Sequence, residues 1–169
     1  MHTLNEISLD SLSFNPFSKI GKEWMLITAG DEKQANTMTA SWGGLGVMWG
    51  KNVVFIVVRE TRYTKEFIDK NDTFSLTFLK EDYRSALNYL GTVSGRDEEK
   101  ITKAGLHLSY DDQTPYLSEG DLVLTCKKMS ATPITPDQFI DDSIEKTWYK
   151  DGNLHTLYIG EITKVLSAQ

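Results

Sequence analysis

Runs of apolar and alternating residues predict a chain built mainly from β-strands. The clearest is Asn52–Arg59, whose core of Val-Val-Phe-Ile-Val-Val is β-branched and aromatic, as in a buried strand. The segment Leu154–Leu166 is apolar at positions 154, 157, 159, 162 and 165, which predicts a long closing strand. Further strands are expected at Glu23–Ala29, Asn36–Trp42, Asp72–Leu79, Leu106–Tyr110 and Asp121–Met129. Glu23–Ala29 and Asn36–Trp42 should form a hairpin across the polar turn between them.

Helical spacing and end signals predict a few helices between these strands. The expected segments are Thr64–Lys70, Asp82–Leu90, Asp97–Ala104 and a helical turn at Thr135–Ile140. Thr61 and Asp82 are candidate N-caps, and Gly91 is expected to stop the second helix. Gly43–Gly46 is rich in glycine and should break the regular structure, permitting a bend or a close approach of the backbone to another group.

The resulting fold class is mainly β with inserted helices, in a mostly antiparallel barrel. Strand-rich folds of this size often close on themselves, which removes exposed sheet edges. No repeat, low-complexity tract or linker divides the chain, so residues 1–169 are expected to form a single domain.

The net charge and the cysteine content argue against nucleic-acid and membrane partners and favour one cellular location. The net charge of −6 and the pI near 5.1 argue against a nucleic-acid or anionic-membrane surface, because phosphate groups need a basic patch. The only cysteine, Cys126, allows no internal disulfide and fits a reducing, cytoplasmic location. It lies within a predicted strand and is expected to pack as a small apolar side chain. The N-terminus lacks the pattern of a signal peptide, and no apolar run is long enough to span a membrane.

A cluster of cationic and hydroxyl side chains marks the junction between strand Asn52–Arg59 and the helix after it. A helix start presents free backbone N–H groups and a partial positive charge. With the guanidinium groups of Arg59 and Arg62 and the hydroxyls of Thr61 and Thr64, this junction could clamp a terminal phosphate. The alternative is that Thr61 only caps the helix while the arginines pair with surface acids.

The preceding strand, Asn36–Trp42, offers small polar groups beside an aromatic ring. Alternation places Asn36, Met38, Ala40 and Trp42 on one face, with Thr37, Thr39 and Ser41 on the other. Backbone groups at the edge of such a strand could hydrogen-bond the pyrimidine edge of a flavin. The alternative is an ordinary hairpin strand with Trp42 in the core. Together with the phosphate clamp, the strand points to bound flavin mononucleotide (FMN).

Two further segments carry candidate site residues. Ser94, Gly95 and Lys100 could reach a phosphate or a ring carbonyl, although this charged stretch also reads as a solvated helix start. His155 could donate a hydrogen bond to substrate or ring, although a histidine on a strand is more often structural. It is the one weak catalytic candidate. No motif supports a metal site, a phosphate loop or a serine nucleophile.

These segments resemble the flavin reductase-like family, whose members form the FMN-binding split barrel, and most closely its flavoredoxin-like branch. The resemblance runs from Pro16 to Ile162. Its most specific parts are Asn36–Gly43, Val58-Arg59 with Arg62–Thr64, Ser94–Asp97 with Lys100, and Tyr158–Ile162. The sequence departs from the family pattern at Glu60, where proline is expected, at Glu98-Glu99, and at Asn153–His155.

The resemblance implies a homodimer with FMN near the subunit interface. It implies that the strand from Met38 to Trp42 lies along the isoalloxazine ring and that Ser94–Lys100 helps to close the site. It also implies that Arg59, Arg62, Tyr63 and Thr64 serve the phosphate. The cofactor-binding residues expected from the residue patterns, from the resemblance or from both are Asn36, Thr37, Met38, Thr39, Ala40, Ser41, Trp42, Arg59, Arg62, Tyr63, Thr64, Ser94, Gly95 and Lys100. The apolar segment Trp42–Trp49 is expected to form an interface or to contact a ligand.

The function that follows is that of an FMN-dependent oxidoreductase. It would take electrons from a reductant such as NAD(P)H, or from a redox protein, and pass them through FMN to an unidentified acceptor. An alternative is a flavin-carrying electron-transfer module that serves a protein partner. A third hypothesis is a binding protein for another flat anionic ligand, such as haem or a different flavin.

Overall fold

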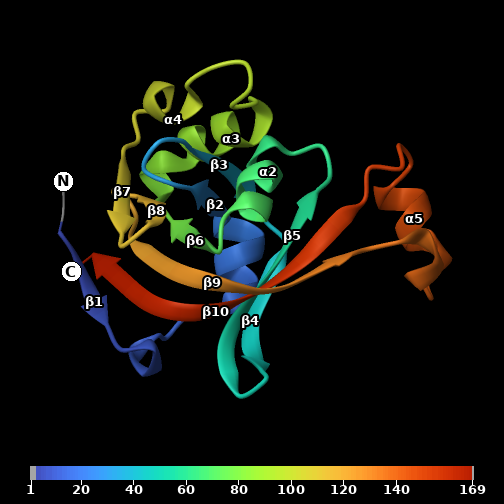
Figure 1. Ribbon diagram of the computed structural model, residues 1–169, viewed down its shortest axis with the longest axis horizontal. Helices are drawn as coiled ribbons and strands as arrows, with labels where there is room; N and C mark the ends of the chain where they lie inside the picture. The colour runs from blue at the N-terminus through green and yellow to red at the C-terminus, as the bar shows by residue number, and fades with distance from the viewer. Residues whose placement is uncertain (1–2, 169) are drawn as a thin grey trace.

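The computed structural model describes residues 3–168, which form a β-structure covered on one side by helices (Figure 1). The strands are β1 (Leu4–Ile7), β2 (Met25–Gly30), β3 (Ala35–Ala40), β4 (Gly43–Met48), β5 (Lys51–Arg59), β6 (Thr73–Phe78), β7 (Leu108–Asp111), β8 (Thr114–Leu117), β9 (Leu122–Pro133) and β10 (His155–Ala168). The helices are α1 (Pro16–Ser18), α2 (Tyr63–Lys70), α3 (Arg84–Thr92), α4 (Lys100–Lys103) and α5 (Asp142–Trp148). Shorter helical turns lie at Leu9–Ser11, Lys19–Glu23, Glu81–Tyr83 and Pro136–Gln138.

Eight strands form one antiparallel sheet that does not close. Its order is β3-β2-β6-β9-β10-β5-β4, with β1 paired to β10, while β7 and β8 form a separate hairpin. The terminal strands β3 and β4 do not pair with each other, as in a split barrel. The prediction of a mainly β, mostly antiparallel split barrel with inserted helices is confirmed.

The core lies inside the curved sheet, with a second apolar cluster beneath the helices. The larger cluster includes the fully buried Ile27, Ile56 and Phe74, which come from three different strands. The smaller one joins Leu26 of β2 to Leu87 and Leu90 of α3. It holds α3 against the sheet beside β3, and this placement brings the C-terminal end of α3 to the candidate site.

The glycine-rich segment after β3 is a strand and not the break that its sequence predicts. Gly43–Met48 forms β4, paired with β5 through the full length of the segment. The expected close approach is confirmed, because a Cβ on Gly43 (φ +146°) would lie 2.5 Å from the carbonyl oxygen of Phe55. A two-residue turn, Trp49-Gly50, joins β4 to β5. Both turn residues have positive φ, 52° and 69°, as in the type I′ turns that favour hairpins.

Four predicted helix ends are wrong, and one of them is the start of the helix expected at Asp97–Ala104, which the structure forms only as α4, Lys100–Lys103. Helix α3 continues through Gly91 to Thr92, because its last turn rests against Thr39 of β3. Asp82 lies in the 3₁₀ turn before α3 and makes no capping bond to it. The N-cap of α2 is Arg62, and the Thr61 hydroxyl accepts a hydrogen bond from the side chain of Asn153 instead.

The sequence patterns also missed α1 and β8, which are short, and β1 and α5, which lie in polar segments with no strong periodicity. The predicted turn at Thr135–Ile140 contains the 3₁₀ turn Pro136–Gln138, and α5 begins shortly after it. Cys126 is fully buried on β9, as expected of a packing residue, and burial raises the pKa of its thiol. Among the residues that the structure describes, no helix is long and apolar enough to cross a membrane.

Candidate functional site

Two adjoining cavities lie between β3, the end of β5 and the α2–α3 region. The first cavity has a volume of about 370 Å³ and the second about 320 Å³. They share Met38, Arg59 and Arg62 in their walls, so together they make one elongated groove. Each is within the range of small-ligand pockets.

The predicted site residues gather around this groove. The first cavity is lined by Asn36, Met38, Arg59, Arg62, Tyr63, Thr64, Ser94, Gly95 and Lys100, with Thr61, Thr92, Val93, Arg96 and Asn153. The second is lined by Met38, Thr39, Ala40, Ser41, Trp42, Arg59, Arg62 and His155, with Val57 and Trp148. Only Thr37 lies outside both linings. Its side chain points to the opposite face of β3, where its hydroxyl bonds that of Thr28 at 2.9 Å.

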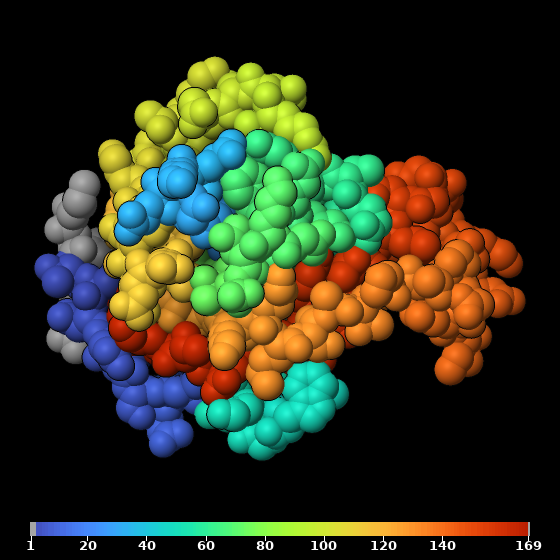
Figure 2. Space-filling model, in the orientation of Figure 1, coloured from blue at the N-terminus to red at the C-terminus, as the bar shows by residue number. Residues whose placement is uncertain are grey.

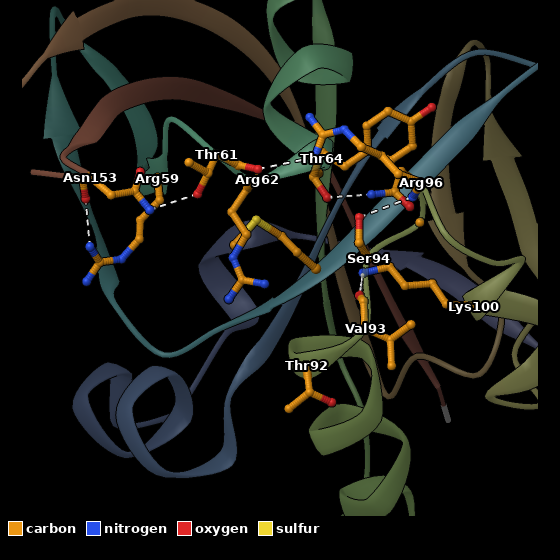
Figure 3. A pocket seen from close by; sticks show the side chains of 14 residues that line it. Arg59, Thr61, Arg62, Thr64, Thr92, Val93, Ser94, Arg96, Lys100 and Asn153 are labelled. Carbon is orange, nitrogen blue, oxygen red and sulfur yellow. Dashed lines mark hydrogen bonds between the residues drawn. The ribbon is translucent and has the colours of Figure 1, made fainter. Parts of the chain in front are cut away.

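Arg62 and Lys100 bring two positive charges to the first cavity without a carboxylate to balance them. Figure 3 shows both side chains reaching toward its centre. Arg62 donates to the carbonyl oxygen of Gly91 at 3.1 Å. Lys100 is 4% exposed and donates to the carbonyl oxygens of Leu90 and Val93 at 3.0 and 2.9 Å. No ion pair with either side chain exists within the part of the chain that the structure describes.

Burial and neighbouring positive charges lower the pKa values of these two cations. Burial and the neighbouring Arg62 charge lower the pKa of Lys100 to about 8. Burial and the charge of Arg59 also lower the pKa of Arg62. A bound anion would relieve both effects, because it supplies the opposite charge that the protein itself does not place there.

A tight set of contacts shapes the opposite wall of the first cavity. The side-chain amide of Asn36 donates to the hydroxyl of Thr64 at 2.8 Å, which ties β3 to the first turn of α2. Gly95 lies directly against this pair, since a Cβ at position 95 would lie 2.2 Å from Asn36 Oδ1. Only glycine therefore fits there without displacing the Asn36–Thr64 contact.

Tyr63 and Ser94 complete the same wall. The hydroxyl of Tyr63 accepts a hydrogen bond from Gln34 at 3.2 Å, and the guanidinium of Arg96 lies 4.7 Å from the centre of its ring. Ser94 Oγ accepts from the backbone N–H of Arg96 at 3.2 Å. Arg96 also pairs with Glu66 of α2, so the loop after α3 is fastened to α2.

Arg59 occupies the boundary between the cavities and is engaged by the chain itself. Its guanidinium donates to the carbonyl oxygens of Asn153 at 2.6 Å and Trp148 at 3.0 Å. Figure 3 shows it turned toward Asn153 and away from Lys100. The antiparallel register of β5 and β10 places His155 directly opposite Arg59.

Three rings form one wall of the second cavity. Trp42 lies edge-on to Trp148, with centroids 5.0 Å apart, and its ring centre is 5.2 Å from that of His155. Trp42 and Trp148 are 38% and 51% exposed, so Trp42 is not the core residue of the alternative interpretation. On the other side, the Thr39 hydroxyl donates to the carbonyl oxygen of Leu87 at 2.5 Å.

His155 is buried and neutral at physiological pH. Burial, and then the charges of Arg59 and Arg62, lower its pKa to about 4. Its Nδ1 lies 2.7 Å from the hydroxyl of Tyr149. With that hydroxyl as donor, Nδ1 accepts and the proton of the neutral ring resides on Nε2. The ring is therefore equipped to donate one hydrogen bond.

Sequence reasoning missed several residues of the groove. Arg96 adjoins the predicted Gly95, and its charge was a usable signal. Asn153 lines the first cavity, and its Oδ1 is buried with no hydrogen-bond partner among the described residues. Trp148 belongs to the unpredicted α5, and no local pattern connects it to Arg59, 89 residues earlier in the chain.

Comparison with known proteins agrees with this architecture. The model of the flavin reductase like domain family matches residues 17–168. The flavoredoxin of Methanosarcina acetivorans superposes with a TM-score of 0.69 at 21% identity, covering 98% of this chain and 76% of that protein. No curated protein matches the chain by sequence.

Two further solved structures are similar in fold. An FMN-binding domain of flavin reductases-like enzyme from Shewanella baltica OS155 matches with a TM-score of 0.69 at 15% identity, covering 99% of this chain and 78% of that one. Nitrilotriacetate monooxygenase component B from Bacillus cereus matches with a TM-score of 0.68 at 16% identity, covering 100% and 84%.

Proposed function

This chain belongs to the flavin reductase like domain family. On that basis we propose that its groove binds FMN and that the protein is an FMN-dependent oxidoreductase. The FMN phosphate occupies the first cavity, and the isoalloxazine ring lies along β3 in the second. The chemistry that FMN supplies when bound is two-electron transfer between a reductant and an acceptor. The chain's own residues bind, orient and shield it.

The observation that carries this proposal is the pair of unbalanced cations in the first cavity. Arg62 and the buried Lys100 face a space that contains no protein carboxylate within the described residues. The first turn of α2 opens on the same cavity at Tyr63 and Thr64, where backbone N–H groups favour an anion. A phosphate group satisfies all these donors at once.

The second cavity suits a flat polar ring. Because β3 is an edge strand, one of its sides has backbone N–H and C=O groups that no neighbouring strand occupies. Such groups match the pyrimidine edge of a flavin, and Met38 and Trp42 offer apolar surface to its body. The neutral His155 contributes a hydrogen-bond donor at the far wall, and we propose no other catalytic residue.

We propose NAD(P)H as the reductant, with a redox protein as the second possibility. Two of the solved structures similar to this chain are named flavoredoxin, which keeps the electron-transfer module as an alternative function. A steady-state assay separates them: NAD(P)H oxidation with a diffusible acceptor supports the enzyme. Reduction only by a ferredoxin-like protein supports the module.

The similar FMN-binding protein of Thermus thermophilus was solved with 1-cyclohex-2-enone and with p-hydroxybenzaldehyde. Both ligands have a single six-membered ring. We propose that the acceptor of this chain includes small cyclic carbonyl compounds or quinones of that kind.

We further propose that the chain acts as a cytoplasmic homodimer with FMN near the interface. The tip of the β4–β5 hairpin exposes Val47, Met48 and Trp49 to 73%, 37% and 54%. Apolar side chains concentrated at one tip are typical of an interface. The buried, unpaired thiol of Cys126 agrees with a reducing compartment.

The direct test of the cofactor is the visible spectrum of the purified protein with mass spectrometry of the released chromophore. The proposal predicts a flavin spectrum and the mass of FMN. A haem spectrum, or the mass of a different flavin, would instead support a binding protein for another flat anionic ligand. A protein that is colourless and stays so with added FMN would contradict the proposal.

A further inference from the structure

One segment reaches the groove from outside the barrel. Residues 134–154, here called the arm, leave the sheet at the end of β9 and return at the start of β10. Figures 1 and 2 show the arm and its helix α5 projecting away from the body of the molecule. No residue of α5 is buried, and within the arm only Tyr149, directly after α5, is buried, at 7% exposure.

The arm is nevertheless fixed at its base. Arg59 donates to the carbonyl oxygens of Trp148 and Asn153, and its guanidinium lies 5.3 Å from the ring centre of Tyr149. Tyr149 stacks on Phe139 and bonds His155. One guanidinium thus joins both ends of a short stretch of the arm to the last residue of β5.

This attachment delivers a single arm side chain to the second cavity. Trp148 is the only arm residue in the lining of that cavity, and it lies edge-on against Trp42 at an interplanar angle of 85°. About half of its surface stays exposed. The indole therefore forms part of the cavity wall beside the proposed position of the flavin ring.

We propose that Trp148, positioned by Arg59, forms a wall of this site that disfavours wider ring-shaped electron acceptors relative to narrower ones. This inference rests on the proposed FMN site. Arg59 is a positioning residue in this respect, because its contacts act through the backbone of the arm. Removing the indole should widen the cavity without disturbing the fold, since α5 contributes no buried side chain.

Equilibrium binding of redox-inert rings to the FMN-loaded, oxidised protein tests the width limit. The dissociation constants of benzoate and 2-naphthoate are read from perturbation of the flavin spectrum. In Trp148→Ala, the dissociation constant of 2-naphthoate should fall by about tenfold relative to that of benzoate, a change typical of altering the wall of an apolar pocket. Trp148→Phe should fall between. Ile140→Ala, a fully exposed arm position that lines neither cavity, is the matched control and should match wild type.

A second readout follows electron transfer. Protein-bound FMN, reduced with stoichiometric dithionite, is mixed with 1,4-benzoquinone or 1,4-naphthoquinone, each of which takes two electrons and two protons to become a hydroquinone. The ratio of the two reoxidation rates cancels intrinsic differences between the variants. Trp148→Ala should shift this ratio by about tenfold toward naphthoquinone.

The role of Arg59 is tested by hydrogen exchange. Arg59→Lys keeps the charge but loses the paired N–H donors. Amides of residues 142–148 should exchange faster in Arg59→Lys, while those of β9 and β10 stay protected.

The outcomes separate the two levels of inference. If neither wild type nor any variant binds FMN, the proposed function itself is contradicted. Normal FMN binding with ligand ratios for Trp148→Ala within twofold of wild type, or shifted toward the smaller ring, would overturn the inference alone. Unchanged exchange in Arg59→Lys would overturn the positioning role.

Discussion

At the scale of single residues, the groove is defined by the cations Arg62 and Lys100. The burial of Lys100, which is 4% exposed, could not be predicted from its charged segment. Arg62 and Thr64 were predicted because residue type and a strand–helix junction suffice to propose an anion site, and Asn36 was predicted from the polar strand that precedes them. The hydrogen-bond partners of the site residues were not predictable. Arg59 bonds the carbonyl of Asn153, 94 positions away, and such contacts depend on the order of strands in the sheet and not on local pattern.

Lys100 gives a prediction about the pH dependence of FMN binding. Its ammonium donates to the carbonyl oxygens of Leu90 and Val93 and forms no ion pair among the described residues, and burial and the charge of Arg62 lower its pKa to about 8. A bound phosphate favours the charged form, so above pH 8 binding must be coupled to proton uptake. FMN affinity should then fall by up to about tenfold per pH unit, while the phosphate itself stays dianionic.

Titrations between pH 7 and 9.5 would measure this. In Lys100→Met the affinity should be lower at pH 7 and should lose the alkaline decline. The control is Lys103→Met, in the same helix but paired with Glu98 outside the groove, which should keep the wild-type profile. A wild-type affinity that is constant up to pH 9.5 contradicts this role for Lys100.

His155 gives a prediction about stability. Its pKa is about 4 in the folded chain, against 6.5 for an unperturbed histidine. Between these values the unfolded chain binds the proton and the folded chain does not, so stability falls as the pH drops through this window. The expected loss between pH 8 and pH 5 is about 2 kcal/mol from this residue.

Urea unfolding of wild type and His155→Gln at pH 8 and pH 5 would isolate that contribution. The glutamine variant should lose less stability on acidification, and the difference between the two proteins is the measured quantity. Equal acid sensitivity of wild type and His155→Gln would show that His155 does not stay neutral.

At the scale of elements, long and strongly apolar strands were predictable and irregular ones were not. β5 and β10 were found close to their observed bounds because their apolar positions are dense. β4 was missed because its glycines mask a strand that pairs closely with β5. The α5 segment has neither a buried face nor a strong periodicity.

The β4–β5 hairpin carries a prediction about assembly. Trp49 has φ +52°, an unfavourable backbone conformation for a tryptophan, and it keeps its side chain exposed at the tip. Asparagine adopts this conformation readily, and Asn-Gly is the preferred type I′ turn. Trp49→Asn should therefore keep or improve hairpin stability while weakening the proposed homodimer by about tenfold or more.

Sedimentation velocity over a range of concentrations would report the dimer constant, and thermal unfolding would report the fold. Lys33→Asn, in the β2–β3 turn at another exposed position, serves as a control for a tip substitution. A wild-type protein that is monomeric at micromolar concentration would contradict the homodimer. A dimer unaffected by Trp49→Asn would place its interface elsewhere.

At the scale of the whole molecule, the sheet order explains why one groove collects residues from across the chain. β3 lies at one edge of the open sheet, and the α2 and α3 helices that follow later strands pack beside it. The family resemblance predicted this split barrel, whereas strand patterns alone predicted only a mostly antiparallel barrel. Strand order is a long-range property, since it depends on which apolar faces cover one another after folding.

The central claim is that the unbalanced cations of the first cavity bind the phosphate of FMN, and titration of the flavin-free protein with FMN and with riboflavin tests it most directly. Arg62→Ala should weaken FMN by about ten- to a hundredfold, the usual value of a charged phosphate contact, and leave riboflavin within about twofold. Lys70→Ala, which removes an exposed cation from the far end of α2, should change neither. If wild type binds riboflavin as tightly as FMN, or if Arg62→Ala weakens both equally, the account of this site is contradicted.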